Sequence, residues 1–101
     1  MNYHNTVQES GQQLFNFRQA AINQDVILLG FFRRHAGELL SPSDVWVRTG
    51  MEAQAVPLTS VRRAISNLTR DGYLVKTSVK HDGVYGRPEN CWTYPRERLA
   101  A

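Results

Sequence analysis

The feature that most constrains the fold is the segment Pro57–Tyr94, in which a helical pattern of apolar residues leads directly into two runs of strand-forming residues. The apolar side chains of residues 58–70 recur at steps of three and four. They are Leu58, Val61, Ile65 and Leu68. This spacing predicts a helix with one buried face and a polar face that carries Arg, Ser, Thr and Asn. Asp71 and Gly72 follow at the place where such a helix ends.

Two strands joined by a turn are expected after this helix. Residues 73–79 are rich in strand formers, and residues 90–94 form a second short run that Pro95 ends. Between them, Gly83 and Gly86 mark the tip of a hairpin. Because an isolated hairpin is only marginally stable in water, it must pack on the helices. The side chains expected to make this contact are Leu74, Val75 and Trp92.

A short helix with a clear start is predicted upstream. Ser41 is a candidate N-cap, Pro42 suits the first helical position, and Asp44 stands where the acid of a capping box reaches back. This helix is expected to stop at Gly50. The linker that follows, residues 51–56, is longer than the turn of a minimal helix-turn-helix.

An earlier helix should contain residues 26–32, which are apolar on every side, and should end at Gly37. A helix that is apolar all round has to be buried all round. One stripe can serve its own domain, and the other must meet the N-terminal segment or a second subunit. Residues 11–22 either cap the core or act as a dimerisation arm. The side chains expected at a subunit contact are Leu14, Phe15, Phe17, Ile27 and Phe31.

Positive charge is concentrated in the C-terminal half of the chain. The 101 residues carry a net charge of +3. Up to Ala55 there are four basic and five acidic residues, and from Val56 onward there are eight basic and four acidic residues. The excess therefore lies on the segment with the polar-faced helix and the hairpin, where it is compatible with a polyanionic partner.

Several classes of protein are disfavoured. A single cysteine, Cys91, allows no internal disulfide and is expected to be a buried, inert thiol. No apolar run reaches the ~20 residues of a membrane span, and the polar start lacks a signal-peptide core, so a cytoplasmic location is expected. His4, His35 and His81 are scattered, which argues against a metal site. Dispersed carboxylates and the lack of phosphate-loop or nucleophile motifs indicate neither an enzyme nor a cofactor.

The polar-faced helix and the hairpin carry two longer motifs. Thr59–Leu74 has the sequence TSVRRAISNLTRDGYL, and Tyr85–Tyr94 has the sequence YGRPENCWTY. In this order, and behind the capped helix at residues 41–49, they resemble the recognition helix and wing of the winged helix-turn-helix family of prokaryotic DNA-binding proteins. The size and polar ends would also suit a phage regulator. The resemblance implies an α+β, mainly α fold, with a three-helix core and a C-terminal two-stranded wing.

The resemblance also implies a recognition helix in the major groove of double-stranded DNA and a wing on the backbone or in the minor groove. The matching positions are Thr59, Ser60, Arg62, Arg63, Ser66 and Asn67 on the helix, Arg87 at the wing tip and Lys80 nearby. Because Arg62 and Arg63 are adjacent, one would contact a guanine edge while the other holds a phosphate. Asn67 could pair with an adenine edge. Arg70 is expected to be a helix-end cation rather than a contact.

The sequence therefore predicts a DNA-binding domain at residues 23–95, preceded by an arm or accessory helix at residues 1–22 and followed by a polar tail at residues 96–101. The expected function is regulation of transcription by occupying an operator. A homodimer would increase the affinity, because one such module buries little surface. Two other classes stay open. A protein-interaction adaptor with the same fold would bind with little dependence on salt, and for an enzyme the sequence offers almost nothing.

Overall fold

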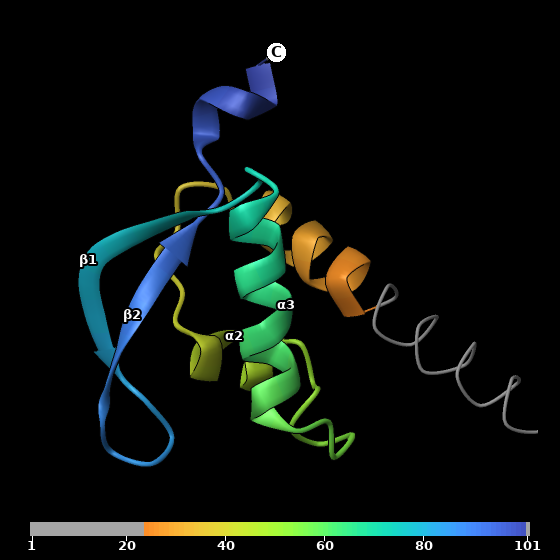
Figure 1. Ribbon diagram of the computed structural model, residues 1–101, viewed down its shortest axis with the longest axis vertical. Coiled ribbons are helices and arrows are strands. Elements are labelled where there is room, and N and C mark those ends of the chain that lie inside the picture. The colour runs from red at the N-terminus through yellow and green to blue at the C-terminus, as the bar shows by residue number, and fades with distance from the viewer. Residues whose placement is uncertain (1–23, 101) are drawn as a thin grey trace, which may run out of the picture.

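The computed structural model describes residues 24–100, in which helices are followed by a β-hairpin (Figure 1). Within these residues the first helix covers positions 24–34. The elements that follow are α2 (Pro42–Arg48), α3 (Leu58–Arg70), β1 (Val75–Asp82), β2 (Pro88–Thr93) and the short 3-10 helix η1 (Arg96–Ala100). The described part of the chain is a mainly helical α+β winged helix, and the predicted fold class is confirmed.

The start of α2 is fixed by its own sequence. The Ser41 hydroxyl accepts a hydrogen bond from the Asp44 N–H at 3.1 Å, and the Asp44 carboxylate accepts one from the Ser41 N–H at 3.0 Å. Pro42 occupies the first helical position, where its missing N–H leaves no hydrogen bond unmade. The helix ends at Arg48, before Gly50 adopts a φ of 81°. The predicted capping box is therefore confirmed.

The linker between α2 and α3 is a compact turn despite its length. The Trp46 indole N–H donates to the Val56 carbonyl oxygen at 2.6 Å, and the Glu52 N–H donates to the Trp46 carbonyl oxygen at 3.0 Å. Met51 is buried in the core, and Ala55 takes a φ of 61° within the turn. The extra residues thus leave α2 and α3 packed against each other.

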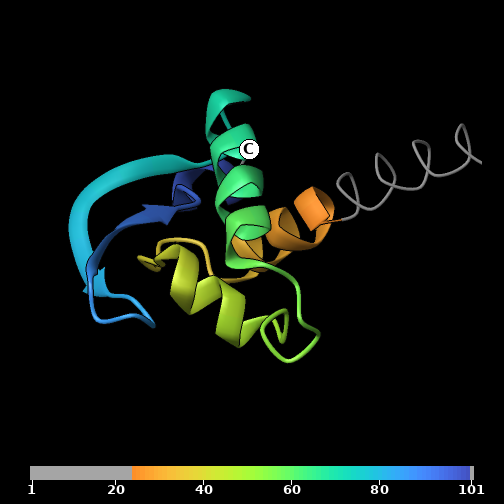
Figure 2. The ribbon, with the colours of Figure 1, turned by 60° about the horizontal axis from the view of Figure 1, so that its bottom comes forward.

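The hairpin is antiparallel, and its register changes once. Near its base, Val75 lies opposite Thr93. Farther along β1 the ladder is interrupted, and there the Thr77 hydroxyl donates to the Cys91 carbonyl oxygen at 2.8 Å. Such an irregularity bends a strand, and the hairpin curves beside the helices (Figure 2).

A short backbone segment between the first helix and α2 adds to the hairpin, which the sequence did not indicate. The Leu40 N–H donates to the Trp92 carbonyl oxygen at 3.0 Å, and the Trp92 N–H donates to the Leu40 carbonyl oxygen at 2.8 Å. The Gly37 N–H adds a bond to the Tyr94 carbonyl oxygen at 3.0 Å. These bonds tie β2 to the helical core and supply the support that two strands alone lack.

The hydrophobic core of residues 24–100 draws on the helices and on the base of the hairpin. Its members include Leu28, Phe32, Leu40, Val45, Ile65 and Leu74. Leu74 is buried and Trp92 packs against the core, as predicted. The prediction for Val75 is wrong, since this side chain is 43% exposed. Successive side chains of an extended chain alternate, and Leu74 takes the inward position.

The first helix buries one face and exposes the other. Leu28 and Phe32 are fully buried, whereas Val26 and Ile27 are 64% and 52% exposed. Within the described residues one stripe therefore serves the domain, as predicted, while the prediction that the other stripe meets the N-terminal segment or a second subunit stays a prediction. The apolar residues divide into a core-facing stripe and an outer pair near the start of the helix.

The residues predicted for a subunit contact fall into three groups. Phe31 is buried in the core of its own domain, with its ring 4.5 Å from the His35 ring, and the prediction of a surface role for it is wrong. Ile27 remains exposed. The other three, Leu14, Phe15 and Phe17, lie outside the described residues.

The polar tail packs on the end of α3. Residues 96–100 form η1, and the Arg98 guanidinium donates to the Tyr73 carbonyl oxygen at 2.8 Å and also to that of Gly72. The same guanidinium lies 6.0 Å from the Tyr94 ring centroid. Between residues 24 and 100, none of the helices has the length and apolarity that crossing a bilayer requires.

Candidate nucleic-acid interface

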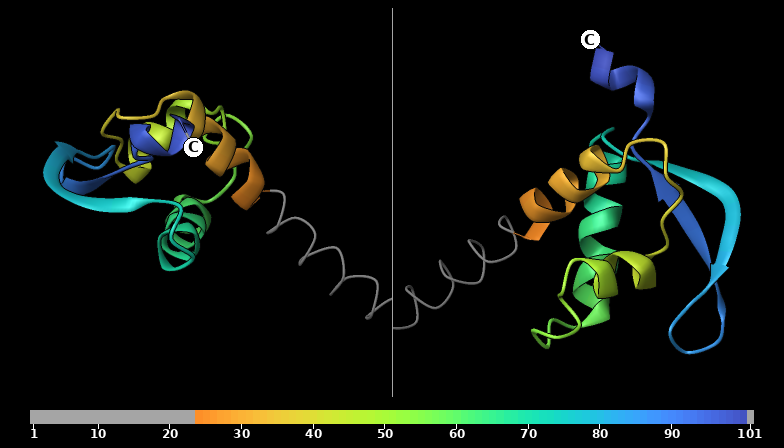
Figure 3. Two further views of the ribbon diagram at one scale, coloured as in Figure 1. Left: turned by 90° about the horizontal axis from the view of Figure 1, so that it is seen from above. Right: turned by 180° about the vertical axis from the view of Figure 1, so that it is seen from behind.

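The polar face of α3 points away from the core. In Figure 1 α3 lies at the front of the molecule, and Figure 3 shows it projecting from the other helices when the molecule is seen from above. Exposed side chains recur along this face at steps of four, three and four, which places them on one line of the helix. We call them the outer stripe, which comprises Thr59, Arg63, Ser66 and Arg70.

The side chains of the outer stripe have few partners within the chain. Among residues 24–100, Arg63 makes no hydrogen bond or ion pair, and Arg70 makes only a 3.5 Å ion pair with its exposed neighbour Asp71. The Thr59 and Ser66 hydroxyls are likewise unpaired within these residues. Two guanidinium groups and two hydroxyls are therefore available to a ligand on this side of the molecule.

Arg62 points instead toward the hairpin. Its Nη2 lies 3.3 Å from Oε2 of Glu89 on β2. The Glu89 side chain is 11% exposed. It also accepts hydrogen bonds from the Ser43 N–H at 3.0 Å and from the Ser43 hydroxyl at 2.7 Å. Arg62 is thus held by a carboxylate of its own chain.

The opposite flank of α3 faces the start of the first helix. Burial raises the pKa of Asp25, while a hydrogen bond from Asn67 and the charge of Arg63 oppose that rise. Ser60 and Asn67 are both half-buried. Asn67, which the resemblance places among the base contacts, therefore lies beside a carboxylate of its own chain.

The hairpin carries the other two predicted cations, Lys80 on β1 and Arg87 in the β1–β2 turn, and both are exposed. The turn is closed by the Gly83 N–H, which donates to the Arg87 carbonyl oxygen at 2.7 Å, and by the Gly86 N–H, which donates to the Gly83 carbonyl oxygen at 2.9 Å. In Figure 1 this turn and the N-terminal end of α3 lie at the same end of the molecule. Figure 2, in which that end comes forward, shows α2 beside them.

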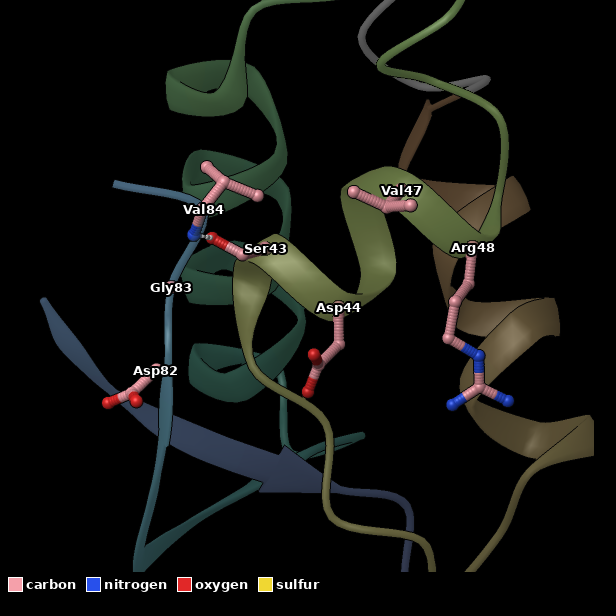
Figure 4. A pocket seen from close by; sticks show the side chains of 7 residues that line it. All are labelled: Ser43, Asp44, Val47, Arg48, Asp82, Gly83 and Val84. Carbon is pink, nitrogen blue, oxygen red and sulfur yellow. Dashed lines mark hydrogen bonds between the residues drawn. The ribbon is translucent and has the colours of Figure 1, made fainter. Parts of the chain in front are cut away.

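Hydrogen bonds join α2 to this turn and to the end of β1. The Val84 N–H donates to the Ser43 hydroxyl oxygen at 3.2 Å, and the His81 Nδ1 lies 2.8 Å from Oδ2 of Asp44. Burial raises the pKa of Asp44, but hydrogen bonds from His81 and Ser41 outweigh it and hold the pKa below its usual value. Figure 4 shows the Ser43–Val84 hydrogen bond beside a small pocket of about 240 Å³, which Asp44 and Gly83 also line. We call the whole set the α2 junction, which comprises Ser41, Ser43, Asp44, His81, Val84 and Glu89.

The structure thus divides the predicted site residues. Thr59, Arg63 and Ser66 lie together on the outer stripe, whereas Ser60, Arg62 and Asn67 lie on its flanks. Sequence reasoning missed the part played by Ser43 and Glu89, which are 46 positions apart. An acid next to a proline in a turn-rich segment gives no local signal of a contact at that separation.

The remaining polar groups give little sign of other chemistry. Within the part of the chain that the structure describes, no three His, Cys, Asp or Glu side chains gather where they could hold a metal. Cys91 is fully buried, as predicted, and burial raises the pKa of its thiol. Such a thiol stays protonated and unreactive at neutral pH.

Comparison with solved structures identifies a bacterial protein with a similar fold. The chain is similar to the Campylobacter jejuni peroxide stress regulator, with a TM-score of 0.60 and 18% sequence identity. The similarity covers 82% of this chain and 56% of that regulator, so the chain spans little more than half of its length. At this level of identity the likeness establishes the fold alone. No protein-family model and no curated protein matches the sequence.

Proposed function

We propose that this chain binds double-stranded DNA in a sequence-specific way and regulates transcription by occupying an operator. The observation that carries the proposal is the outer stripe, a line of hydroxyls and guanidinium groups on the exposed face of α3 whose only partner among residues 24–100 is the Asp71 carboxylate beside Arg70. A helix with this face fits the major groove, and the β1–β2 turn beside it can reach the adjacent backbone. The fold shared with a bacterial stress regulator supports a regulatory role.

The individual roles follow from side-chain chemistry. Arg63 would contact a guanine edge through two hydrogen bonds, with Thr59 and Ser66 on neighbouring bases or phosphates. Lys80 and Arg87 would neutralise phosphates from the wing. To contact DNA, Arg62 and Asn67 would each have to leave a neighbouring carboxylate, and Ser60 would have to leave its half-buried position. These three residues are therefore secondary candidates.

A homodimer is part of the proposal. Val26 and Ile27 leave an apolar area on the first helix, and residues 11–22 before it contain further apolar side chains. A second copy that covered this area would present two recognition helices to one duplex. The two half-sites would then lie about one helical turn apart, ~34 Å.

The test is selection of bound fragments from a random pool of duplexes, followed by titration of the selected duplex and a scrambled one at several salt concentrations. We expect a preferred, palindromic site and an affinity that falls steeply with salt, at roughly 0.9 logarithmic units per phosphate neutralised. Failure to enrich any sequence, combined with no duplex binding at low salt, would point to the adaptor function and end the proposal.

A further inference from the structure

Glu89 lies where three elements of the domain meet. From β2, its Oε1 accepts a hydrogen bond from the Ser43 N–H at 3.0 Å, and its Oε2 accepts one from the Ser43 hydroxyl at 2.7 Å. The same Oε2 lies 3.3 Å from Nη2 of Arg62 on α3. One nearly buried carboxylate therefore connects the hairpin to α2 and to α3.

Ser43 extends this connection to the tip of the hairpin. Its side chain is buried, and its hydroxyl donates to Glu89 while it accepts from the Val84 N–H at 3.2 Å. Val84 belongs to the β1–β2 turn that carries the exposed Tyr85 and Arg87. The carboxylate and the hydroxyl thus fix both the return strand and the turn against the same end of α2.

Gly83 completes the arrangement by leaving room for the carboxylate. A Cβ atom at this position would lie 2.6 Å from Cδ of Glu89, which is closer than real Cβ contacts allow. At Gly86, the other glycine of the turn, nothing lies within 4 Å of such a Cβ atom. A side chain at position 83 would therefore displace Glu89 from Ser43 and Arg62.

We propose that Glu89 is the positioning residue of the wing: its contacts with Ser43 and Arg62 set the direction of the β1–β2 turn relative to α3. The proposal deepens the DNA-binding function and rests on it for its consequence, which is that Arg87 reaches the duplex only while Glu89 holds the turn. A charged carboxylate suits the role because hydrogen bonds to an ionised acceptor are stronger than neutral ones. Lost contacts would leave the turn attached through its strands alone.

The position of the turn can be measured without DNA. Spin labels on Tyr85→Cys at the turn and Ala53→Cys in the α2–α3 linker report one distance distribution, because the native Cys91 is fully buried. We expect a narrow distribution in the parent chain, and a broader or displaced one in Glu89→Ala and in Gly83→Ala. Glu52→Gln removes a charge from an exposed site and should leave the distribution unchanged.

Two variants keep this test decisive if one fails to fold. Gly83→Ala alters an accessible turn and keeps the Glu89 side chain, so it reports on the same contacts by a different route. Distributions that superpose on the parent in whichever variants stay folded, as judged by circular dichroism, would overturn the positioning role.

The consequence for DNA is tested with a double-mutant cycle on the selected duplex. In the parent chain, Arg87→Ala should lower the salt slope by about 0.9, and in the Glu89→Ala background it should lower the slope by almost nothing. An equal decrease in both backgrounds would show that Arg87 reaches DNA without Glu89 and would overturn the inference. If the parent chain binds no duplex, the proposed function fails, while the spin-label distances still decide the role of Glu89.

Discussion

The α2 junction and the outer stripe of α3 contain similar polar side chains and place them in opposite surroundings. At the junction, Glu89 and Ser43 pair at 2.7 Å and His81 approaches Asp44 to 2.8 Å. On the outer stripe, Arg63 makes no hydrogen bond or ion pair with another described residue. Polar groups that are paired inside the chain hold its elements together, and polar groups left in an exposed line are open to a ligand.

Arg62 and Arg63 show the difference within one turn of helix. Adjacent residues of an α-helix point about 100° apart, and here that rotation places one guanidinium beside Glu89 and leaves the other exposed. Substitutions at the junction should therefore lower the free energy of unfolding, whereas substitutions on the outer stripe should lower DNA affinity and leave stability almost unchanged.

The largest effect is expected for Arg63→Ala. Loss of a guanidinium that contacts a guanine edge should weaken binding to the selected duplex by about 1–3 kcal/mol and reduce the preference over a scrambled duplex. Fluorescence anisotropy titrations of both duplexes measure this. Because Arg63 is exposed, the free energy of unfolding should change by less than about 0.5 kcal/mol.

Arg62→Ala is the matched comparison for this experiment. Arg62 must leave Glu89 before it can contact DNA, so its removal should cost less affinity than the removal of Arg63. Its half-exposed ion pair should contribute at most about 1 kcal/mol to stability. Equal losses of DNA affinity in Arg62→Ala and Arg63→Ala would contradict the prediction that the outer stripe contributes more to binding than the flank next to the hairpin.

The next effect concerns the junction. Ser41→Ala removes the side chain that accepts from the Asp44 N–H and should lower the free energy of unfolding by about 1 kcal/mol. Urea unfolding measures the change. Ser78→Ala is the control, because Ser78 is exposed on β1 and lies outside both regions. If the two serine variants are equally stable, the capping box contributes nothing.

The elements that the sequence predicted correctly are those specified by neighbouring residues. The capping box spans four residues, and the apolar stripe of α3 recurs every three or four. The bridge between Leu40 and Trp92 joins distant parts of the chain, so no local pattern contains it. The prediction that Val75 packs on the helices was wrong for a related reason, because strand-forming residues alone do not reveal which of the two alternating faces of a strand points inward.

The sequence predicted which types of residue lie on the polar face of α3, but it did not predict the direction in which each side chain points. The resemblance identified polar positions on α3, and the outer stripe contains Thr59, Arg63 and Ser66 from that set. Which flank meets the hairpin depends on how the helix packs, and that is set by contacts across the whole domain. The acid that holds Arg62 comes from β2, 27 positions later.

A smaller, pH-dependent effect is expected at the junction. Hydrogen bonds hold the pKa of Asp44 below its usual value, so this carboxylate stabilises the fold above its unfolded pKa and loses that contribution as the pH falls through the folded one. Asp44→Asn should therefore lower the free energy of unfolding at neutral pH. As the pH falls below about 4, the free energy of unfolding should decrease less in this variant than in the parent. Urea unfolding across this range measures both.

The pKa of Asp25, beside the other flank of α3, is shifted in the opposite direction to that of Asp44. Burial raises its pKa, so the ionised form costs stability at neutral pH, and that cost is relieved as the pH falls through the raised value. Asp25→Asn should therefore be as stable as the parent or more stable at neutral pH. A loss of stability like that of Asp44→Asn would mean that Asn67 and Arg63 hold this carboxylate more strongly than burial opposes it.

The smallest effect distinguishes two interpretations of Arg70. The sequence suggested a cation that stabilises the end of α3, which would make Arg70→Ala less stable by about 0.3–1 kcal/mol and leave DNA binding intact. The position of Arg70 on the outer stripe, 72% exposed, instead predicts a phosphate contact, with every duplex weakened alike and the salt slope lowered by about 0.9. Arg70→Lys keeps the charge and should retain most of the slope. If Arg70→Ala changes stability and leaves the salt slope unchanged, Arg70 makes no phosphate contact, and the DNA-binding part of the outer stripe stops at Ser66.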